Sequence, residues 1–367
     1  MATFDVVFEG GGAKGVAFAG ALEVLYQGGH RLARLVGTSA GAITATLCAA
    51  GFTPAELLAA AGERVNGKPR FTRFLDVPAR DSFDAKRLER SLLMKMLQSV
   101  DVPFIPEALE RRFDRAFLSA LLANPLYAQL FAFVECGGFF AGRAFLDWIR
   151  EKLALKGIAA DDTLESFHAK TGADLSLVVS DTTDMEMLVL NHRTAPEVPV
   201  AWAVRMSMSI PFIWQEVVWR AEWGTYLGRS KAGNIIVDGG VLSNFPMRLI
   251  ATSDESVRAI MGEASPLEAL NLGLMIDENL PVPGAPEAAP PMAGLVDFPP
   301  VRRVARLLDT MMGAWDSEMV RRFNADICRL PAKGYGVLEF DLEGARLDAL
   351  LQAARQAMAA HLRARLR

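Results

Sequence analysis

The sequence predicts an α/β fold with a mainly parallel central sheet flanked by helices. Within residues 1–51, a short apolar run, a glycine-rich turn and a helical segment follow one another twice. That order is typical of the βα units that build a parallel sheet. The composition agrees, because 51% of the 367 residues are hydrophobic and 22% are charged, which allows a sizeable core and argues against disorder.

The two βα units define the first elements. Residues 4–8 form an apolar run that ends at a glycine-rich segment, as a buried parallel strand ends at a loop. Residues 16–26 are expected to form a helix that stops at paired glycines. Residues 32–36 fit a second strand, and residues 40–50 fit a helix of small side chains that Gly51 ends.

The remaining residues are expected to complete a single domain, residues 1–367. Residues 64–156 are rich in Phe and Leu and lack β-branched runs of strand length, which predicts a helical cap inserted into the core domain. Residues 281–367 are expected to hold a proline-rich loop and then C-terminal helices at 301–323 and 347–367. Further strands are expected at residues 175–179, 187–190, 235–237, 270–275 and 337–340.

Charge and composition exclude several classes of function. The net charge of −4 gives no electrostatic footprint for nucleic acid. The N-terminal segment has no secretory pattern, and no uncharged apolar run reaches the roughly 18 residues of a membrane span. The cysteines Cys48, Cys136 and Cys328 are scattered, which suits a reduced, cytoplasmic protein and gives no metal-ligand spacing. We therefore expect no metal and no cofactor.

The first candidate site is a Gly-x-Ser-x-Gly pentapeptide that joins an expected strand to an expected helix. Gly37 and Gly41 flank Ser39 within it. A sharp turn between strand and helix exposes the serine hydroxyl, and small neighbours let the backbones cross closely. The positive end of the following helix favours the negative charge that develops there. The alternative is a plain glycine-rich turn with a capping serine.

The second candidate site is the glycine loop after the first strand, whose glycines leave several backbone N–H groups free to point at one spot. Such a loop binds either a phosphate or an oxyanion. A nucleotide fingerprint needs an acidic residue at the end of the second strand, and residues 32–38 offer none. An oxyanion hole is the better match, with Lys14 orienting the loop or adding positive potential unless it is simply a solvated lysine. The loop consists of Gly10, Gly11, Gly12, Ala13, Lys14 and Gly15.

The third candidate is Asp238, which follows the apolar run 235–237 and precedes Gly239 and Gly240. An aspartate at the end of a strand lies where α/β sheets place their sites, although an Asp-Gly turn is the simpler explanation. No histidine is well placed to act as the base of a triad. The four are His30, His168, His192 and His361. A dyad, in which Asp238 takes the proton of Ser39 directly, therefore fits this sequence better.

These three blocks, in this order and spacing, resemble the signature blocks of the patatin-like phospholipase family. Residues 205–211 also resemble the helix-and-turn block of that family, and residues 237–246 are a close match. The resemblance implies an α/β core and calcium-independent hydrolysis of lipid acyl esters. By motif position it implies Ser39 as the nucleophile, Asp238 as the base and the Gly10–Gly12 backbone as the oxyanion hole.

The cap is the expected source of a channel for the acyl chain. Its residues 109–121 carry an apolar face, and Phe139 and Phe140 follow in the segment richest in Phe. Ordinary packing of an amphipathic cap is the alternative. The expected partner is a lipid substrate met at a membrane surface, with no protein activator identified. The rival functions are a catalytically silent module that binds lipid or protein, and a nucleotide-binding protein.

Overall fold

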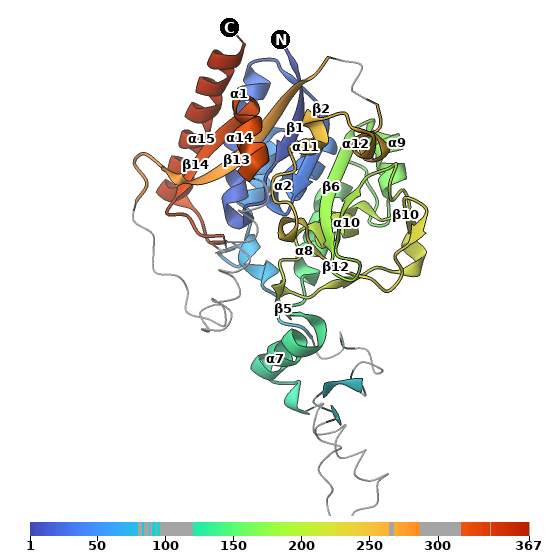
Figure 1. Ribbon diagram of the computed structural model, residues 1–367. Coiled ribbons are helices and arrows are strands. Elements are labelled where there is room, and N and C mark those ends of the chain that lie inside the picture. The colour runs from blue at the N-terminus through green and yellow to red at the C-terminus, as the bar shows by residue number, and fades with distance from the viewer. Residues whose placement is uncertain are drawn as a thin grey trace, which may run out of the picture.

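The computed structural model describes residues 1–79, 83, 88, 90–92, 94–95, 120–263, 268–286, 317–337 and 339–366. It has a central eight-stranded sheet with helices on both faces (Figure 1). The strand order is β14-β13-β1-β2-β6-β12-β9, and β7 pairs with β6. The predicted α/β class is confirmed. The strands are β1 (Thr3–Phe8), β2 (Arg31–Thr38), β6 (Asp174–Asp181), β7 (Glu186–Leu190), β9 (Val217–Val218), β12 (Ile235–Asp238), β13 (Leu270–Pro281) and β14 (Ile327–Lys333).

Five neighbouring strands, from β14 to β6, pair in parallel. The strands β7 and β12 run antiparallel to β6, and β9 runs antiparallel to β12. The sheet is thus parallel through its centre and antiparallel at one side. Because β12 runs antiparallel to β6, it starts near the carboxyl end of β6 and runs back along it. Asp238 is the last residue of β12.

Alternation along the strands produces two layers of core. On β6, Val178 faces one layer while Leu177 and Val179 face the other, since successive strand side chains point to opposite faces. One face is covered by α1 (Ala17–Gln27), α2 (Ala40–Ala49), α3 (Pro54–Ala61), α8 (Arg143–Ala154), α10 (Val200–Ser207) and α15 (Gly344–Arg365). The other is covered by α11 (Arg248–Ala251) and α12 (Glu255–Met261).

The remaining elements are short or lie outside the two layers. Figure 1 shows α7 (Pro125–Cys136) standing below the part that holds the sheet. The other helices are η1 (Gly12–Val16), η2 (Arg70–Phe74), η4 (Ala221–Trp223), η5 (Gly239–Val241), η7 (Asn324–Asp326), α9 (Leu164–Thr171) and α14 (Ser317–Arg322). The paired short strands are β3 (Arg64–Val65) with β4 (Lys68–Pro69), β5 (Gly138–Phe140) with β8 (Phe212–Trp214), and β10 (Thr225–Tyr226) with β11 (Arg229–Ser230).

Most expected elements are present, with one clear exception. The strand expected at 337–340 is wrong, because those residues that are described lie in turns and unpaired backbone. The strand that completes this edge is β14, ten residues earlier. Most of the apolar face expected at 109–121, the proline-rich stretch beyond residue 286 and most of the helix expected at 301–323 fall outside the described residues. Among the helices that are described, none is both long and apolar enough to cross a bilayer.

Candidate active site

Ser39 occupies a strained turn between β2 and α2. Its φ of 53° and ψ of −121° lie where residues with a side chain rarely go, a conformation that costs of the order of 1–3 kcal/mol and clusters at functional sites. The flanking glycines are required by close backbone contacts. A Cβ on Gly37 would lie 2.4 Å from the Gly41 carbonyl oxygen, and one on Gly41 would lie 2.2 Å from that of Phe8. The small residues of the pentapeptide thus allow this turn to form.

The strand register brings Asp238 to the level of Ser39. Thr38, just before the serine, pairs with Val178, and the next residue, Val179, pairs with Asp238. Gly239 then passes against β6 so closely that a Cβ would lie 2.3 Å from the Val178 carbonyl oxygen. Two residues that are 199 positions apart in the chain are therefore separated by one intervening strand.

The Asp238 carboxyl group is buried, with 2% exposure. Its Oδ1 accepts a hydrogen bond of 2.8 Å from the Gly240 amide. Among the described residues, Oδ2 has no hydrogen-bond partner of acceptable geometry. Burial raises the pKa of Asp238 to about 7, and the nearby Ser39 side chain and the Gly240 amide oppose this rise. The site therefore holds a carboxyl group that can take up and release a proton near neutral pH.

The glycine loop after β1 lies against Ser39, since a Cβ on Gly10 would be 3.2 Å from the serine Cβ. The Gly10 amide donates to the Asn244 carbonyl oxygen at 3.0 Å, so it is already engaged. Within the described part of the chain, the amides of Gly11 and Gly12 donate to no acceptor. These two amides, together with the first amide of α2 at Ala40, which has no intrahelical acceptor, are the donors available to an oxyanion.

Distant segments hold the glycine loop in shape. Gly12 has a φ of +55°, and a Cβ there would lie 2.2 Å from the Val337 carbonyl oxygen. The Ala13 amide donates to the same carbonyl at 2.8 Å. Gly15 passes against α2, where a Cβ would lie 2.7 Å from the Ala40 Cβ. Gly12 and Gly15 are thus positions where the loop has no room for a side chain.

The positive charge of Lys14 is engaged in an ion pair. Its side chain is 2% exposed and forms an ion pair with Glu278 on β13. The interpretation as a solvated surface lysine is wrong, and the lysine ties the loop to the sheet.

The four histidines lie away from Ser39. His30 and His168 line a separate cavity beside Arg31 and Asp174, at the amino ends of β2 and β6. The ring of His192 stacks on that of His168 at 3.7 Å between centroids, and burial lowers its pKa to about 4. His361 lies in α15. No histidine is among the described residues that line the cavity at Ser39.

An apolar cavity of about 100 Å³ opens beside Ser39. Its walls come from α2, α3, η2 and α8, and from Met208, Ile210, Trp214 and Phe340. The aromatic rings on it include Phe71, Phe74, Phe145 and Trp148. The expected Phe139 and Phe140 are not among its described lining residues. They lie buried on β5, where Phe139 stacks on Phe133 at 4.4 Å between ring centroids, and β5 pairs with β8, the strand that carries Trp214 of the cavity wall.

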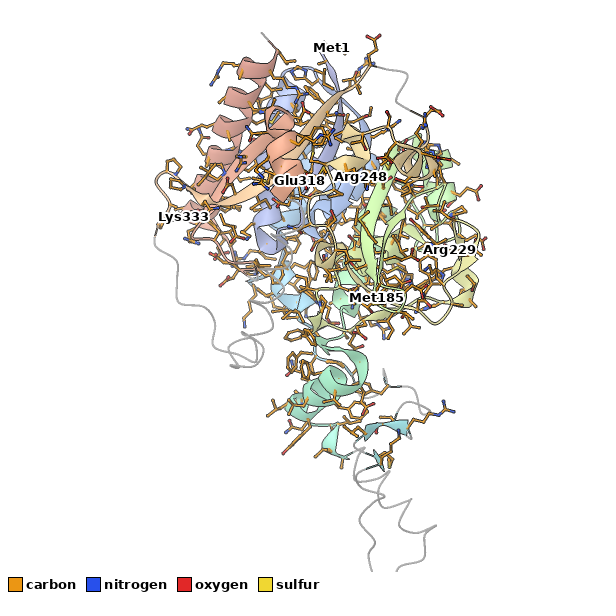
Figure 2. All side chains as sticks on the ribbon, in the orientation of Figure 1. Met1, Met185, Arg229, Arg248, Glu318 and Lys333 are labelled. Carbon is orange, nitrogen blue, oxygen red and sulfur yellow. The ribbon has the colours of Figure 1, made fainter. Side chains whose placement is uncertain are left out.

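One group of carboxylates has the geometry to hold a metal ion, since oxygens of Asp181, Asp184 and Glu186 lie within 4.8 Å of one another. The ammonium group of Lys231, 1% exposed, forms ion pairs with all three. Arg229 on β11 and Met185 in the β6–β7 turn mark this side of the molecule in Figure 2. The lysine thus supplies the positive charge that an ion would bring.

Comparisons with known proteins point to one family. The model of the family described as patatin-like phospholipase matches residues 6–251. The uncharacterized protein YqhO of Bacillus subtilis (strain 168) is 36% identical over 264 residues, covering 70% of this chain and 69% of YqhO. The probable lipid hydrolase 463L of invertebrate iridescent virus 6 is 23% identical over 111 residues, which cover 30% of this chain and 34% of the viral protein.

Two crystal structures are also similar at low identity. One is VipD from Legionella pneumophila, with 16% identity and a TM-score of 0.47, covering 99% of this chain and 67% of VipD. The other is the type III effector protein ExoU, with 17% identity and a TM-score of 0.45, covering 100% of this chain. This chain spans about half of the ExoU chain, 53%.

Proposed function

Because the chain belongs to the patatin-like phospholipase family, we propose that it is a serine acyl hydrolase that cleaves acyl esters of phospholipids or related lipids without calcium. One observation carries the proposal: a buried carboxyl group with a pKa near 7 lies within reach of the side chain of a serine on a strained turn. A base in this pKa range is suited to proton transfer near neutral pH.

In the acylation step, Ser39 Oγ attacks the ester carbonyl carbon and its proton passes to Asp238 Oδ2. The carbonyl oxygen takes the negative charge and is stabilised by the amides of Gly11, Gly12 and Ala40. Such preorganised donors make a large contribution to catalysis. The tetrahedral intermediate then expels the alcohol, which leaves with the proton from Asp238, and the acyl group stays on Ser39.

In the deacylation step, a water molecule attacks the acyl-enzyme and gives a proton to Asp238. The proton returns to Ser39 as the fatty acid departs, which restores both groups. The aspartate thus acts as base and then acid in each half of the cycle, for which a pKa close to the working pH is favourable.

The cavity beside Ser39 is proposed to hold the acyl chain. It is lined by aliphatic and aromatic side chains, and each buried methylene contributes about 0.8 kcal/mol. The acyl site is therefore assigned to the walls made by α2, α3, η2 and α8. The channel expected at Phe139 and Phe140 would act only through packing, because those rings do not line the cavity.

Calcium independence is proposed because, in the one carboxylate group of suitable spacing among the described residues, the Lys231 ammonium group already forms an ion pair with each of the three carboxylates. Cytoplasmic location with peripheral contact at a lipid surface is proposed from the buried free thiols of Cys48, Cys136 and Cys328 and from the substrate class.

The test compares wild-type protein with Ser39→Ala on p-nitrophenyl butyrate and on phospholipid vesicles, each with and without EDTA. We expect Ser39→Ala to retain less than about 1% of kcat/KM, and EDTA to leave the wild-type rate unchanged. A fluorophosphonate should add to Ser39 of the wild type, as shown by peptide mass spectrometry. A folded Ser39→Ala protein with substantial activity would exclude the dyad, and wild-type protein that is inert toward every ester would favour a silent lipid- or partner-binding module.

A further inference from the structure

The turn after α10 contacts the backbones of both proposed catalytic residues. Ser207, the last residue of α10, accepts a hydrogen bond through its Oγ from the Ser39 amide at 3.0 Å. Two residues later, the Ser209 carbonyl oxygen accepts one from the Asp238 amide at 2.9 Å. A segment of three residues therefore spans from the nucleophile to the base.

The two hydrogen bonds of the Ser207 hydroxyl group fix the direction of its O–H bond. Its Oγ donates to the Val178 carbonyl oxygen at 2.7 Å, and a hydroxyl has a single proton to donate. The lone pairs of the oxygen are thereby left to the Ser39 amide. Since Ser207 is fully buried, no water competes for either bond.

The Ser39 amide needs this acceptor because of the strained turn. A buried N–H group without a partner is costly, and the φ of 53° at Ser39 is itself unfavourable for a residue with a side chain. Ser207 supplies the acceptor at the residue where the strain lies. The Val178 carbonyl, which anchors Ser207, also lies against Gly239, so the same strand supports the residue that follows the base.

Arg205 fixes this segment to the wall of the acyl cavity. Its guanidinium group is 3% exposed and donates to Ser209 Oγ. It also donates to the Ala141 and Gln215 carbonyl oxygens, each at 3.0 Å. Ala141 lies just before α8, the helix that carries Phe145 and Trp148 in the cavity. Arg205 thus connects the turn after α10 to the segment before α8 and to the residue after β8.

We infer that Ser207 is a positioning residue, which holds the nucleophile turn in its strained form and sets the Ser39 side chain relative to Asp238. The inference rests on the proposed function, because it assigns Ser207 to the reaction of Ser39. Small displacements of reacting groups lower rates strongly, so removing the acceptor should reduce kcat. Within the described part of the chain, both hydrogen bonds of the Ser207 hydroxyl group are to backbone atoms, so substrate binding should be little changed.

The experiment measures kcat and KM of the full chain on p-nitrophenyl butyrate for Ser207→Ala and for the pair Ser207→Thr and Ser207→Val. We expect Ser207→Ala to lower kcat at least about tenfold, with KM changed less than about twofold. Thr and Val have the same shape, so their ratio isolates the hydroxyl group from the effect of added volume. We expect Ser207→Thr to exceed Ser207→Val in kcat by at least about fivefold.

Ser176→Ala is the matched control. Ser176 is a fully buried serine on the same strand as Val178, and its Oγ contacts Asn191 and Met261 rather than the site. It should lower the Tm and leave kcat unchanged. A folded Ser207→Ala protein with wild-type kcat, equal kcat values for Thr and Val, or an equal loss of kcat in Ser176→Ala would each overturn the inference.

A parallel Ser39→Ala assay separates the two failures. If Ser39→Ala is inactive while Ser207→Ala is unaffected, the proposed nucleophile stands and only the positioning role is lost. If Ser39→Ala remains active, the proposed function fails and the positioning role fails with it.

Discussion

At the scale of single residues, Asp238 links activity to stability through its raised pKa. Its carboxyl group titrates near pH 7 in the folded protein and near pH 3.9 in an unfolded chain. Only the ionised form can accept the serine proton. Burial raises the pKa of Asp238 into the range of a useful base. The same burial destabilises the folded protein at every pH at which Asp238 is ionised.

The first prediction concerns the rate. We expect kcat/KM for p-nitrophenyl butyrate to rise with pH, to reach half its maximum near pH 7, and to level off above that. Asp238→Asn should lose most of the activity over the whole range. A pH profile that is flat from pH 5 to pH 9 would contradict the assignment of Asp238 as the base.

The second prediction concerns stability, and its sign follows from proton uptake. Between about pH 4 and pH 7 the folded state keeps a proton on Asp238 that the unfolded chain has released, so the free energy of unfolding falls as the pH rises through this window. Asp238→Asn removes this dependence. The Tm of the variant minus that of the wild type should therefore increase from pH 5 to pH 8 in calorimetry, and a constant difference would show that the pKa is not raised.

Sequence patterns predicted the residues that the structure brings together at this site, and missed their supports. Ser39 and Asp238 were found because each lies in a glycine-rich motif next to an apolar run. The engagement of the Gly10 amide by Asn244 could not be predicted, since it depends on how two segments 234 residues apart pack. The resemblance at residues 205–211 marked Ser207 as part of a family block, but the hydrogen bond to the Ser39 amide appears only in three dimensions.

At the scale of elements, the cavity beside Ser39 is built partly by the predicted cap, through η2 and α8, and partly by α2 and α3, for which the sequence predicts no such role. Helix α3 presents Leu57, Ala60 and Ala61 to the cavity, and the two alanines leave space that a larger side chain would fill. The expected source, Phe139 and Phe140, was chosen for ring density in the sequence. Ring density does not report direction, and the Phe139 ring stacks on Phe133 instead.

The third prediction follows from this wall. Ala61→Trp should lower kcat/KM for p-nitrophenyl laurate at least about tenfold while butyrate hydrolysis changes less than about twofold, because the ring takes space that a long chain needs. Ala59→Trp is the matched control, since Ala59 is exposed on the same helix and does not line the cavity. Equal losses for both esters, or equal effects of the two variants, would place the acyl chain elsewhere.

The edge strand β14 shows why one element was missed. Its sequence, ICRLPAK, contains Pro331, and a proline argues against a strand in the middle of a sheet. At the edge, a proline costs little, because its missing N–H group would face no neighbouring strand. The run at 337–340 looks more like a strand, but it follows Gly334 and Gly336, and its described residues form no strand, with Val337 hydrogen-bonded to the glycine loop.

At the scale of the whole molecule, the family match ends before the sheet does. Residues 6–251 carry the motifs, yet β13, which lies outside that match, is one of the five parallel strands and pairs with β1. Helix α15 covers that side with buried residues such as Leu350, Ala354 and Met358. The sequence predicts a strand at residues 270–275 and helices nearer the C-terminus, but no pattern in it shows that they pack beside β1 and support the site.

The fourth prediction is that a fragment of residues 1–251 does not fold into an active enzyme. Without β13 and α15, the strand β1 would become an unpaired edge and the apolar faces of β1 and α1 would be exposed to water. We expect the fragment to aggregate or to lack a cooperative thermal transition, whereas the full chain shows one. A fragment that melts cooperatively and hydrolyses p-nitrophenyl butyrate would show that the sheet does not need its C-terminal strands.

The contacts between the glycine loop and the C-terminal part of the chain also determine when the loop can reach its final shape during synthesis. The loop at Gly11 and Gly12 lies against Ile276 and Val337, which a ribosome adds more than 260 residues after it makes the loop. Domains fold as their residues emerge during synthesis, and this site lacks its oxyanion donors in their final arrangement until residue 337 has left the exit tunnel. The site is therefore incomplete in a growing chain until residue 337 has been translated.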